Sequence, residues 1–142
     1  MRSLLDINVW LALTFSGHPH HRAALTWFDE KEDGSCLFCR MTQQGYLRLA
    51  TNPKVFAADA LDLPGAWGCY DTLMSDLRVG YTEEIPGLEG QWRKLTGQAS
   101  FSAKIWNDAF LASLAICGDL EMVSFDRGFR RYDGLRLTVL GE

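Results

Sequence analysis

The sequence lacks any long apolar run, and no stretch of its 142 residues is long enough to cross a bilayer. Its first residues lack the basic region, apolar run and small-residue cleavage site of a signal peptide. Basic residues are also in the minority, since 14 Lys and Arg face 18 Asp and Glu for a net charge of −4. We therefore predict a cytoplasmic protein with no membrane partner and no broad basic surface for nucleic acid. A nuclease remains compatible with this charge, because a carboxylate-rich metal site itself adds negative charge.

Closely spaced cysteine pairs are scarce as well. The chain has four cysteines, of which only Cys36 and Cys39 form a C-x-x-C spacing. That spacing occurs in redox pairs and in half-sites for zinc. However, the segment is apolar, no second close pair exists, and thioredoxin-type chemistry requires a thiol at a helix start. We predict buried thiols in a strand, because free cysteine packs as a small hydrophobe.

The chain has no internal repeat and no low-complexity linker. It alternates short apolar runs with longer helical patterns, which is typical of a parallel sheet covered by helices on both faces. Its length is enough for a single domain with its own core. We predict one α/β domain over residues 1–142 with a central parallel sheet of about five strands. The expected strands are Ser3–Leu5, Cys36–Cys39, Val79–Ile85, Glu121–Phe125 and Leu135–Leu140.

Helical patterns are expected over residues 19–28, 42–50, 64–77, 88–97 and 105–117. Pro19 and Pro64 are suited to helix starts, and Gly118 is suited to a left-handed cap after the last helix. An apolar stripe at helical spacing predicts core packing for Trp67, Tyr70, Met74 and Leu77. Trp10 and Phe15 are also expected in the core, the alternative being contact with a base or with a partner's helix.

Aspartates stand at strand ends and near a helix start. Asp6 follows the first strand, Asp126 follows the residues 121–125, and Asp108 lies near the start of the last helix. Ligands of open α/β sheets bind at the carboxyl ends of strands, so we expect these side chains to converge. Grouped carboxylates require protons or cations to offset their repulsion. Their oxygen ligands suit Mg²⁺ or Mn²⁺, which predicts metal-assisted phosphodiester hydrolysis. The alternative is that each aspartate caps a helix or lies in an exposed loop.

Four segments, in order, resemble the PIN-domain ribonucleases of the VapC toxin family. Residues 4–13, LLDINVWLAL, resemble the opening strand of these proteins, and residues 107–115, NDAFLASLA, resemble their acidic helix. Residues 122–129, MVSFDRGF, resemble a later acidic segment, and residues 41–53, MTQQGYLRLATNP, are similar to a stretch typical of the VapC branch. The order and spacing agree over nearly the whole chain.

The resemblance implies the toxin of a type II toxin–antitoxin pair. Such a protein is an Mg²⁺- or Mn²⁺-dependent endoribonuclease that hydrolyses cellular RNA, such as tRNA or rRNA, by metal-activated water. Carried over by position, Asp6, Asp108 and Asp126 would be the catalytic metal ligands, with Asn8 and Ser124 as supporting residues. The resemblance also implies a homodimer, a VapB-like antitoxin that covers the site, and contact with DNA only through that antitoxin.

The position of the family's second acid differs in this chain. Gln43, with Gln44 as an alternative alignment, stands where PIN nucleases typically have a glutamate. An amide oxygen supplies no charge and is a weaker ligand for a hard cation, so we expect a single well-bound metal ion. Acids before the second strand would lie at the opposite end of the sheet, in a solvated turn; these are Asp29, Glu30 and Asp33.

Basic residues and histidines supply further candidates. Guanidinium groups pair with phosphates, so RNA contacts are predicted for Arg48, Arg127, Arg130 and Arg131. Arg127 and Arg130 follow Asp126 closely, and ordinary surface charge is their alternative. A metal site is not favoured for the histidines, which lack acidic or thiol partners at recognised spacing. These are His18, His20 and His21, for which we expect a role at a helix entry.

Two other functions compete with the ribonuclease. A catalytically weak PIN-like binding or regulatory module would follow if Gln43 removes activity. A phosphotransfer protein with a nucleophilic aspartate needs a paired acid beside Asp6 and a lysine at a later strand end. The sequence Asp6-Ile7-Asn8 lacks that acid, and Lys104 precedes a helix. The ribonuclease is therefore the favoured function.

Overall fold

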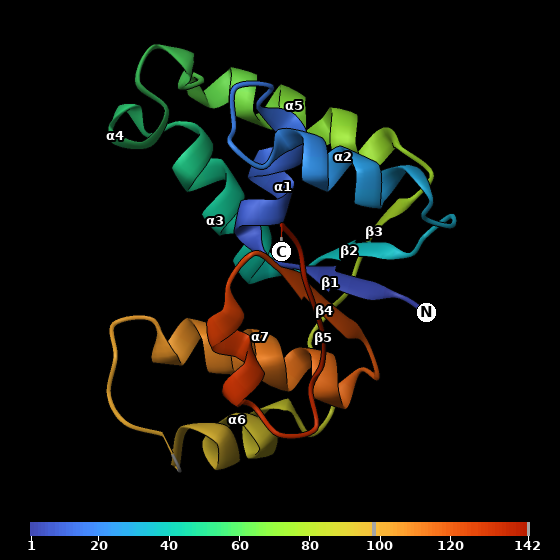
Figure 1. Ribbon diagram of the computed structural model, residues 1–142, viewed down its shortest axis with the longest axis vertical. Coiled ribbons are helices and arrows are strands. Elements are labelled where there is room, and N and C mark those ends of the chain that lie inside the picture. The colour runs from blue at the N-terminus through green and yellow to red at the C-terminus, as the bar shows by residue number, and fades with distance from the viewer. Residues whose placement is uncertain (98, 142) are drawn as a thin grey trace.

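The computed structural model describes residues 1–97 and 99–141, in which one five-stranded sheet lies between two layers of helices (Figure 1). All neighbouring strands are parallel, in the order β3-β2-β1-β4-β5. The strands are β1 Ser3–Leu5, β2 Cys36–Phe38, β3 Val79–Tyr81, β4 Glu121–Ser124 and β5 Arg136–Val139. The predicted α/β class is confirmed. The third strand was predicted too long, because its partner β2 offers only Cys36–Phe38 for pairing.

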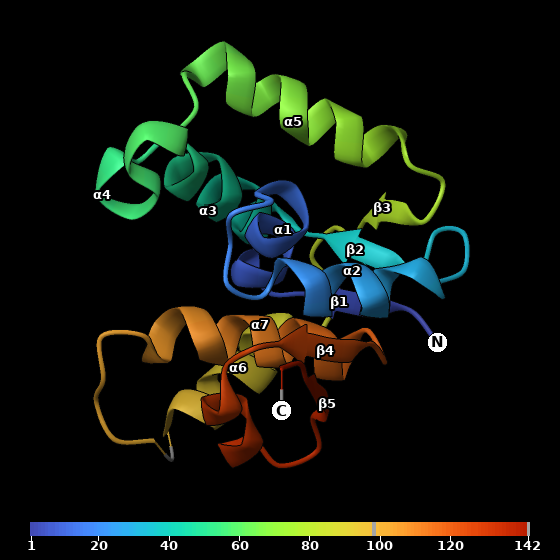
Figure 2. The same ribbon diagram turned by 45° about the horizontal axis from the view of Figure 1, so that its top comes forward.

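Helices cover both faces of the sheet (Figures 1 and 2). One face carries α1 Ile7–Thr14, α2 His21–Asp29, α3 Arg40–Ala50 and α5 Leu63–Ser75. The other carries α6 Leu88–Gly97 and α7 Ile105–Cys117. Shorter pieces are α4 Pro53–Phe56 and the 3₁₀ turns η1 Ala57–Asp59 and η2 Arg127–Arg131. Among the described residues, no helix combines the length and the apolar character needed to cross a bilayer.

Alternate residues of the central strands point to opposite faces and build two cores. Leu5 and Val123 pack beneath the α1, α2, α3 and α5 layer, whereas Leu4 and Met122 pack against α6 and α7. All four side chains are fully buried. A strand that is buried on both faces reads as a continuous apolar run, which is why the strands of this chain are visible in its sequence.

Aromatic stacking holds α1 on the sheet. The Trp10 and Phe38 rings lie parallel, with centroids 3.8 Å apart and an interplanar angle of 7°. Phe15 stacks on Phe56 of α4 at 3.9 Å. Both Trp10 and Phe15 are buried, which confirms the prediction of core packing for them.

The predicted apolar stripe on the fifth helix is wrong in two of its residues. Tyr70 is buried, but Trp67 is 51% exposed and Leu77 is 77% exposed. Because α5 ends at Ser75, Leu77 lies beyond the helix and outside its periodicity. Apolar spacing alone therefore overstates how much of α5 faces the core.

Two predicted helix ends also differ from the structure. The helix α2 begins at His21 rather than at Pro19, because His18, Pro19 and His20 form a turn in which the His20 amide donates to His18 Nδ1. Gly118 keeps a right-handed conformation with φ −86°, and the left-handed residue is Asp119 with φ 53°. The last turn of α7 thus extends through Gly118, whose amide donates to the Leu114 carbonyl at 2.9 Å.

The two closely spaced cysteines are free and buried. Cys36 lies in β2, as predicted, and burial raises the pKa of its thiol. Cys39 lies one residue past the strand and caps α3, where the Thr42 hydroxyl lies 3.6 Å from its sulfur. The expectation that both thiols lie within a strand and away from a helix start is therefore wrong for Cys39.

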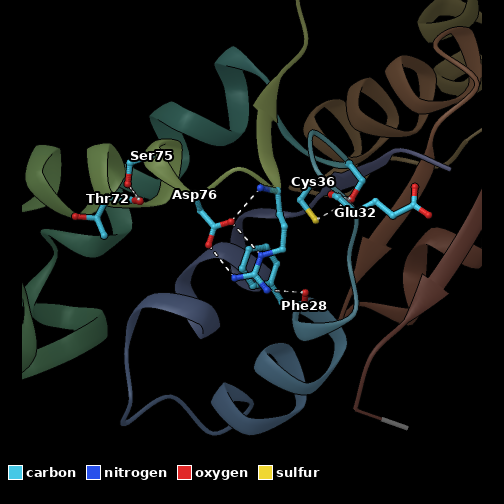
Figure 3. Close-up of polar contacts among 8 residues, drawn as sticks. Phe28, Glu32, Cys36, Thr72, Ser75 and Asp76 are labelled. Atoms are coloured by element: carbon cyan, nitrogen blue, oxygen red, sulfur yellow. Dashed lines mark hydrogen bonds and ion pairs between the residues drawn. The ribbon is translucent and has the colours of Figure 1, made fainter.

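Arg78, the residue before β3, forms a polar cluster with Phe28 and Asp76, which are labelled in Figure 3. Its Nη2 donates to Asp76 Oδ2 at 2.8 Å and its Nη1 to the Phe28 carbonyl at 3.2 Å. Its guanidinium also lies over the Phe28 ring, 3.9 Å from the centroid. Hydrogen bonding to Arg78 lowers the pKa of Asp76. This cluster joins the end of α2 to the start of β3.

Candidate active site

Asp6 links the end of β1 to the start of α1. Its amide donates to the Val123 carbonyl of β4 at 2.9 Å, which fixes its backbone at the sheet edge. Its carboxylate caps α1, with Oδ1 accepting from the Ile7 amide at 2.8 Å. Its Oδ2 accepts from the Ser124 hydroxyl at 2.7 Å. Both carboxylate oxygens are thus held in place by this chain.

Ser124 joins two of the predicted acidic positions. Its fully buried hydroxyl donates to Asp6 and accepts from the Asp126 amide at 2.9 Å. Because β1 and β4 are neighbours at the point where the strand order reverses, this bridge lies where open α/β sheets bind their ligands. The hydroxyl therefore fixes Asp6 relative to the backbone of Asp126.

Lys104 is a charged neighbour of Asp126 that sequence reasoning did not assign to the site. Its Nζ donates to Asp126 Oδ2 at 2.9 Å, while Asp126 Oδ1 accepts from the Gly128 amide at 2.8 Å. Lys104 precedes α7 and lies four residues before Asp108. That spacing places both residues on one side of a helix and was the available signal. A Cβ at Gly128 would approach Asp126 Oδ1 to 3.0 Å, so a side chain there would crowd this carboxylate.

Asp108 joins Asp6 across a shared depression. A hollow of about 170 Å³, here called the site hollow, is lined by both aspartates together with Asn8, Lys104 and Asn107. Asp108 is the fourth residue of α7 and is partly buried, whereas Asn8 is exposed on α1. The structure thus brings the predicted residues Asp6, Asp108 and Asn8 to one depression, with Asp126 attached to its edge through Lys104.

Burial and crowding act differently on the three carboxyl groups. Burial, aided by the charges of Asp6 and Asp126, raises the pKa of Asp108 to about 6. Burial, aided by the Asp126 charge, also raises the pKa of Asp6, although the Ser124 hydrogen bond opposes it. Hydrogen bonds from Lys104 and the Gly128 amide hold the pKa of Asp126 below its usual range. The Lys104 ammonium only partly offsets the negative charge of this group.

Gln43 is not among the residues that line the site hollow. It is buried, and its Oε1 accepts a hydrogen bond from Arg40. The residues of α3 that do line the hollow are the apolar Met41 and Leu49. Between them, a Cβ at Gly45 would approach Ile7 Cδ1 to 2.1 Å, so no larger side chain fits there without movement of Ile7. Of the residues that α3 contributes to the site hollow, none is an acid or an amide, and Gln44 lines a neighbouring hollow together with Met41.

The other predicted residues lie outside this hollow. Arg48 is exposed on α3, and Arg127 and Arg130 are exposed on η2. Arg131, which the sequence also offered for RNA contact, attracts Asp108 and Asp126 electrostatically. His20 stacks on Phe125 with ring centroids 4.4 Å apart, and His21 Nδ1 lies 2.7 Å from the Ala12 carbonyl. His20 is also the N-cap residue of α2, and its carbonyl accepts from the Ala24 amide at 3.0 Å, which confirms the expected role at a helix entry.

Replacing Asp108 by Asn is expected to flatten the pH dependence of stability in protein freed of divalent cations. The pKa of Asp108 is about 6 in the folded chain and about 3.9 in an unfolded one. As pH falls from about 7 to 4, the Asp108 carboxyl takes up a proton at a higher pH in the folded chain than in the unfolded one. Acidification over this range therefore raises the contribution of this group to the free energy of unfolding. The variant should lose that gain and melt a few degrees higher at pH 7. Calorimetry in EDTA from pH 4.5 to 7.5 measures this, and equal slopes for both proteins would contradict it.

Comparisons with known proteins identify the family and agree with the fold. The PIN-domain family model matches residues 3–135. Ribonuclease VapC41 of Mycobacterium tuberculosis is 42% identical over 144 residues, covering 98% of this chain and 99% of the relative. The VapBC2 structure from Rickettsia felis, bound to a DNA fragment from their promoter, shares the fold with a TM-score of 0.71, 13% identity and 99% coverage of each chain. VapC20 of Mycobacterium tuberculosis, a sarcin–ricin loop cleaving toxin, gives a TM-score of 0.65 at 14% identity, with coverage of 90% and 92%. The chain belongs to the PIN-domain family and, within it, to the VapC ribonuclease toxins.

Proposed function

We propose that this VapC-family protein is an endoribonuclease that depends on Mg²⁺ or Mn²⁺ held by Asp6, Asp108 and Asp126. The observation that carries the proposal is the arrangement of these acids, which come from β1, α7 and the end of β4. Asp6 and Asp108 line one hollow, and Ser124 bonds both Asp6 and the Asp126 amide. Such a group, formed by segments far apart in sequence, is unusual unless a ligand requires it.

The donor chemistry fits a hard divalent cation. Carboxylate oxygens from the three aspartates and the amide oxygen of Asn8 are ligands that Mg²⁺ and Mn²⁺ prefer. As placed within residues 1–97 and 99–141, no three His, Cys, Asp or Glu side chains stand close enough together to hold a metal ion. Asp126 is instead held by Lys104 at 2.9 Å. The Lys104 side chain is 69% exposed and can release Asp126 at little cost.

The chain's own residues prepare the site for hydrolysis. Ser124 directs its proton to Asp6 Oδ2 and so orients that carboxylate. A bound Mg²⁺ or Mn²⁺ would lower the pKa of a water molecule and offset charge on the phosphate under attack. Lys104, once separated from Asp126, can contact a substrate phosphate as a flexible point charge. Because the hollow-facing side of α3 supplies no acid, we propose a single cation rather than two.

The same proposal covers the biological setting. The substrate is cellular RNA such as tRNA or rRNA in the cytoplasm, and residues 1–142 act as one PIN domain. The partners are a second copy of the chain and a VapB-like antitoxin, through which alone DNA is contacted. The fold shared with the VapBC2 structure, which is bound to promoter DNA, supports an antitoxin partner. The net charge of −4 is consistent with DNA contact through another protein.

Purified protein is expected to cleave total RNA in Mg²⁺ or Mn²⁺ and to leave it intact in excess EDTA. Adding either cation back beyond the chelator should restore cleavage, because the carboxylates are unchanged by its removal. Electrophoresis of end-labelled RNA measures the products. RNA that stays intact with both cations would contradict the proposal and favour a catalytically weak binding module. The absence of an acid on the hollow-facing side of α3 is the observation that supports this alternative.

A further inference from the structure

A row of surface hollows leads from the carboxylates to the half-buried Trp92 and the exposed Trp106. The site hollow shares Met41 and Asn107 with a hollow of about 250 Å³, here called the middle hollow. The middle hollow shares Trp92 with a third one of about 540 Å³, here called the tryptophan hollow. The tryptophan hollow is lined by Glu89, Trp92, Arg93, Thr96, Gly97 and Trp106. Because neighbouring hollows share wall residues, the three hollows form a row from Asp108 to Trp106, here called the depression.

The tryptophans at the far end are held in a fixed arrangement. Trp92 lies on α6 and Trp106 on α7, two helices that run side by side on one face of the sheet (Figures 1 and 2). Trp92 Nε1 donates to the Trp106 carbonyl at 3.0 Å, and their rings are perpendicular with centroids 6.2 Å apart. Trp92 also packs edge-on against Phe110 at 5.3 Å. Trp106 nevertheless remains 58% exposed, so its indole is available to a ligand.

We propose that Trp92 and Trp106 form a subsite that stacks a nucleobase of single-stranded RNA. The middle hollow would then guide the phosphodiester chain from this base to Asp108. This inference rests on the proposed function, since its ligand is the proposed substrate. Aromatic rings bind bases of any sequence through their faces, and an indole that is already positioned loses little freedom on binding.

Charge along the depression favours stacking over backbone attraction. Arg93 pairs with Glu89 at 3.0 Å, but both side chains are more than three-quarters exposed, so this bond exchanges readily for a phosphate. Arg40 at the middle hollow is accompanied by Glu84. Each phosphate contact to a single strand contributes about −0.7 to the slope of log affinity against log salt concentration. Two such contacts therefore predict a slope of only about −1.4. A single strand held mainly by basic residues would show a steeper one.

The test titrates labelled single-stranded oligoribonucleotide with protein in EDTA, where cleavage is suppressed, and follows anisotropy. Trp106→Ala should weaken binding about tenfold, within the range known for base–aromatic stacking. Trp106→Phe should keep most of the affinity, because it keeps a ring. The matched control is Trp67→Ala, which removes a tryptophan that is 51% exposed on α5, on the other face of the sheet, and should change nothing. In cleavage assays, Trp106→Ala should raise KM and leave kcat unchanged.

Equal affinity of wild type and Trp106→Ala overturns the subsite. So does a variant that binds RNA normally but loses self-association in sedimentation, since the tryptophans would then contact a second copy. Wild-type cleavage together with no effect of Trp106→Ala defeats the subsite alone. Binding that depends on Trp106, with RNA left uncut in Mg²⁺ and Mn²⁺, supports the subsite and defeats the proposed nuclease function alone.

Discussion

Replacing Asp6 by Asn is expected to reduce RNA cleavage at least about a hundredfold. The Ile7 amide and the Ser124 hydroxyl both donate to the Asp6 carboxylate, at 2.8 and 2.7 Å. An asparagine has one accepting oxygen and an NH₂ group that faces one of these donors, so it loses a hydrogen bond as well as the charge. A loss of about 3 kcal/mol in transition-state stabilisation corresponds to this factor. Initial rates of oligoribonucleotide cleavage in Mn²⁺ measure it.

The matched control for this variant is Asp119→Asn. Asp119 is exposed and pairs with Arg136 at 2.9 Å, away from the site, and its positive φ of 53° is tolerated by asparagine. The charge change is therefore the same, and cleavage should stay within about twofold. Circular dichroism should show both variants folded, since burial already disfavours the charged form of Asp6. Full activity of folded Asp6→Asn would remove Asp6 from the proposed ligand set.

Phe38→Ala is expected to lower the free energy of unfolding by about 3–5 kcal/mol. Phe38 is fully buried at the end of β2, stacked on Trp10 and in edge contact with Tyr46 and Tyr70. Its removal leaves a cavity between α1, α3 and α5 that rigid rings cannot close. Urea denaturation followed by fluorescence measures the change.

Phe101→Ala is the corresponding control. Phe101 is 86% exposed, so its removal should change stability by no more than about 0.5 kcal/mol. If Phe38→Ala also cost this little, the ring stack would not be a main source of stability for α1.

The sequence predicts this fold well where both faces of an element are buried. The strands β1, β2 and β4 and the helix α7 occur where apolar runs predict them, because an interior parallel strand leaves few polar positions. The prediction fails where an apolar residue continues the helical spacing beyond the last residue of the helix. Leu77 continues the α5 spacing yet lies beyond Ser75, where the chain turns toward β3. Family membership, inferred from four ordered segments, is confirmed by the family match and the curated relative.

The candidate site is only partly visible in the sequence. Strand ends identify Asp6 and Asp126 because carboxyl ends of parallel strands share one edge. Strand ends do not identify Lys104, because its place in the site depends on the contact that its exposed side chain makes with Asp126. The orientation of Gln43 is equally hidden, because a shift of one or two positions along α3 turns a side chain from the hollow toward the core. The roles of these residues stay predictions until the variants are measured.

The central place of β1 has a consequence for biosynthesis. Its neighbour β4 is separated from it by most of the chain, and the Ser124–Asp6 hydrogen bond spans 118 residues. On the ribosome, β1 therefore emerges long before the strand that completes one of its edges. Lys104, Asp108 and Asp126 emerge late as well, so a nascent chain contains Asp6 without its companions. The proposed site of Asp6, Asp108 and Asp126 can therefore assemble only when translation is nearly finished.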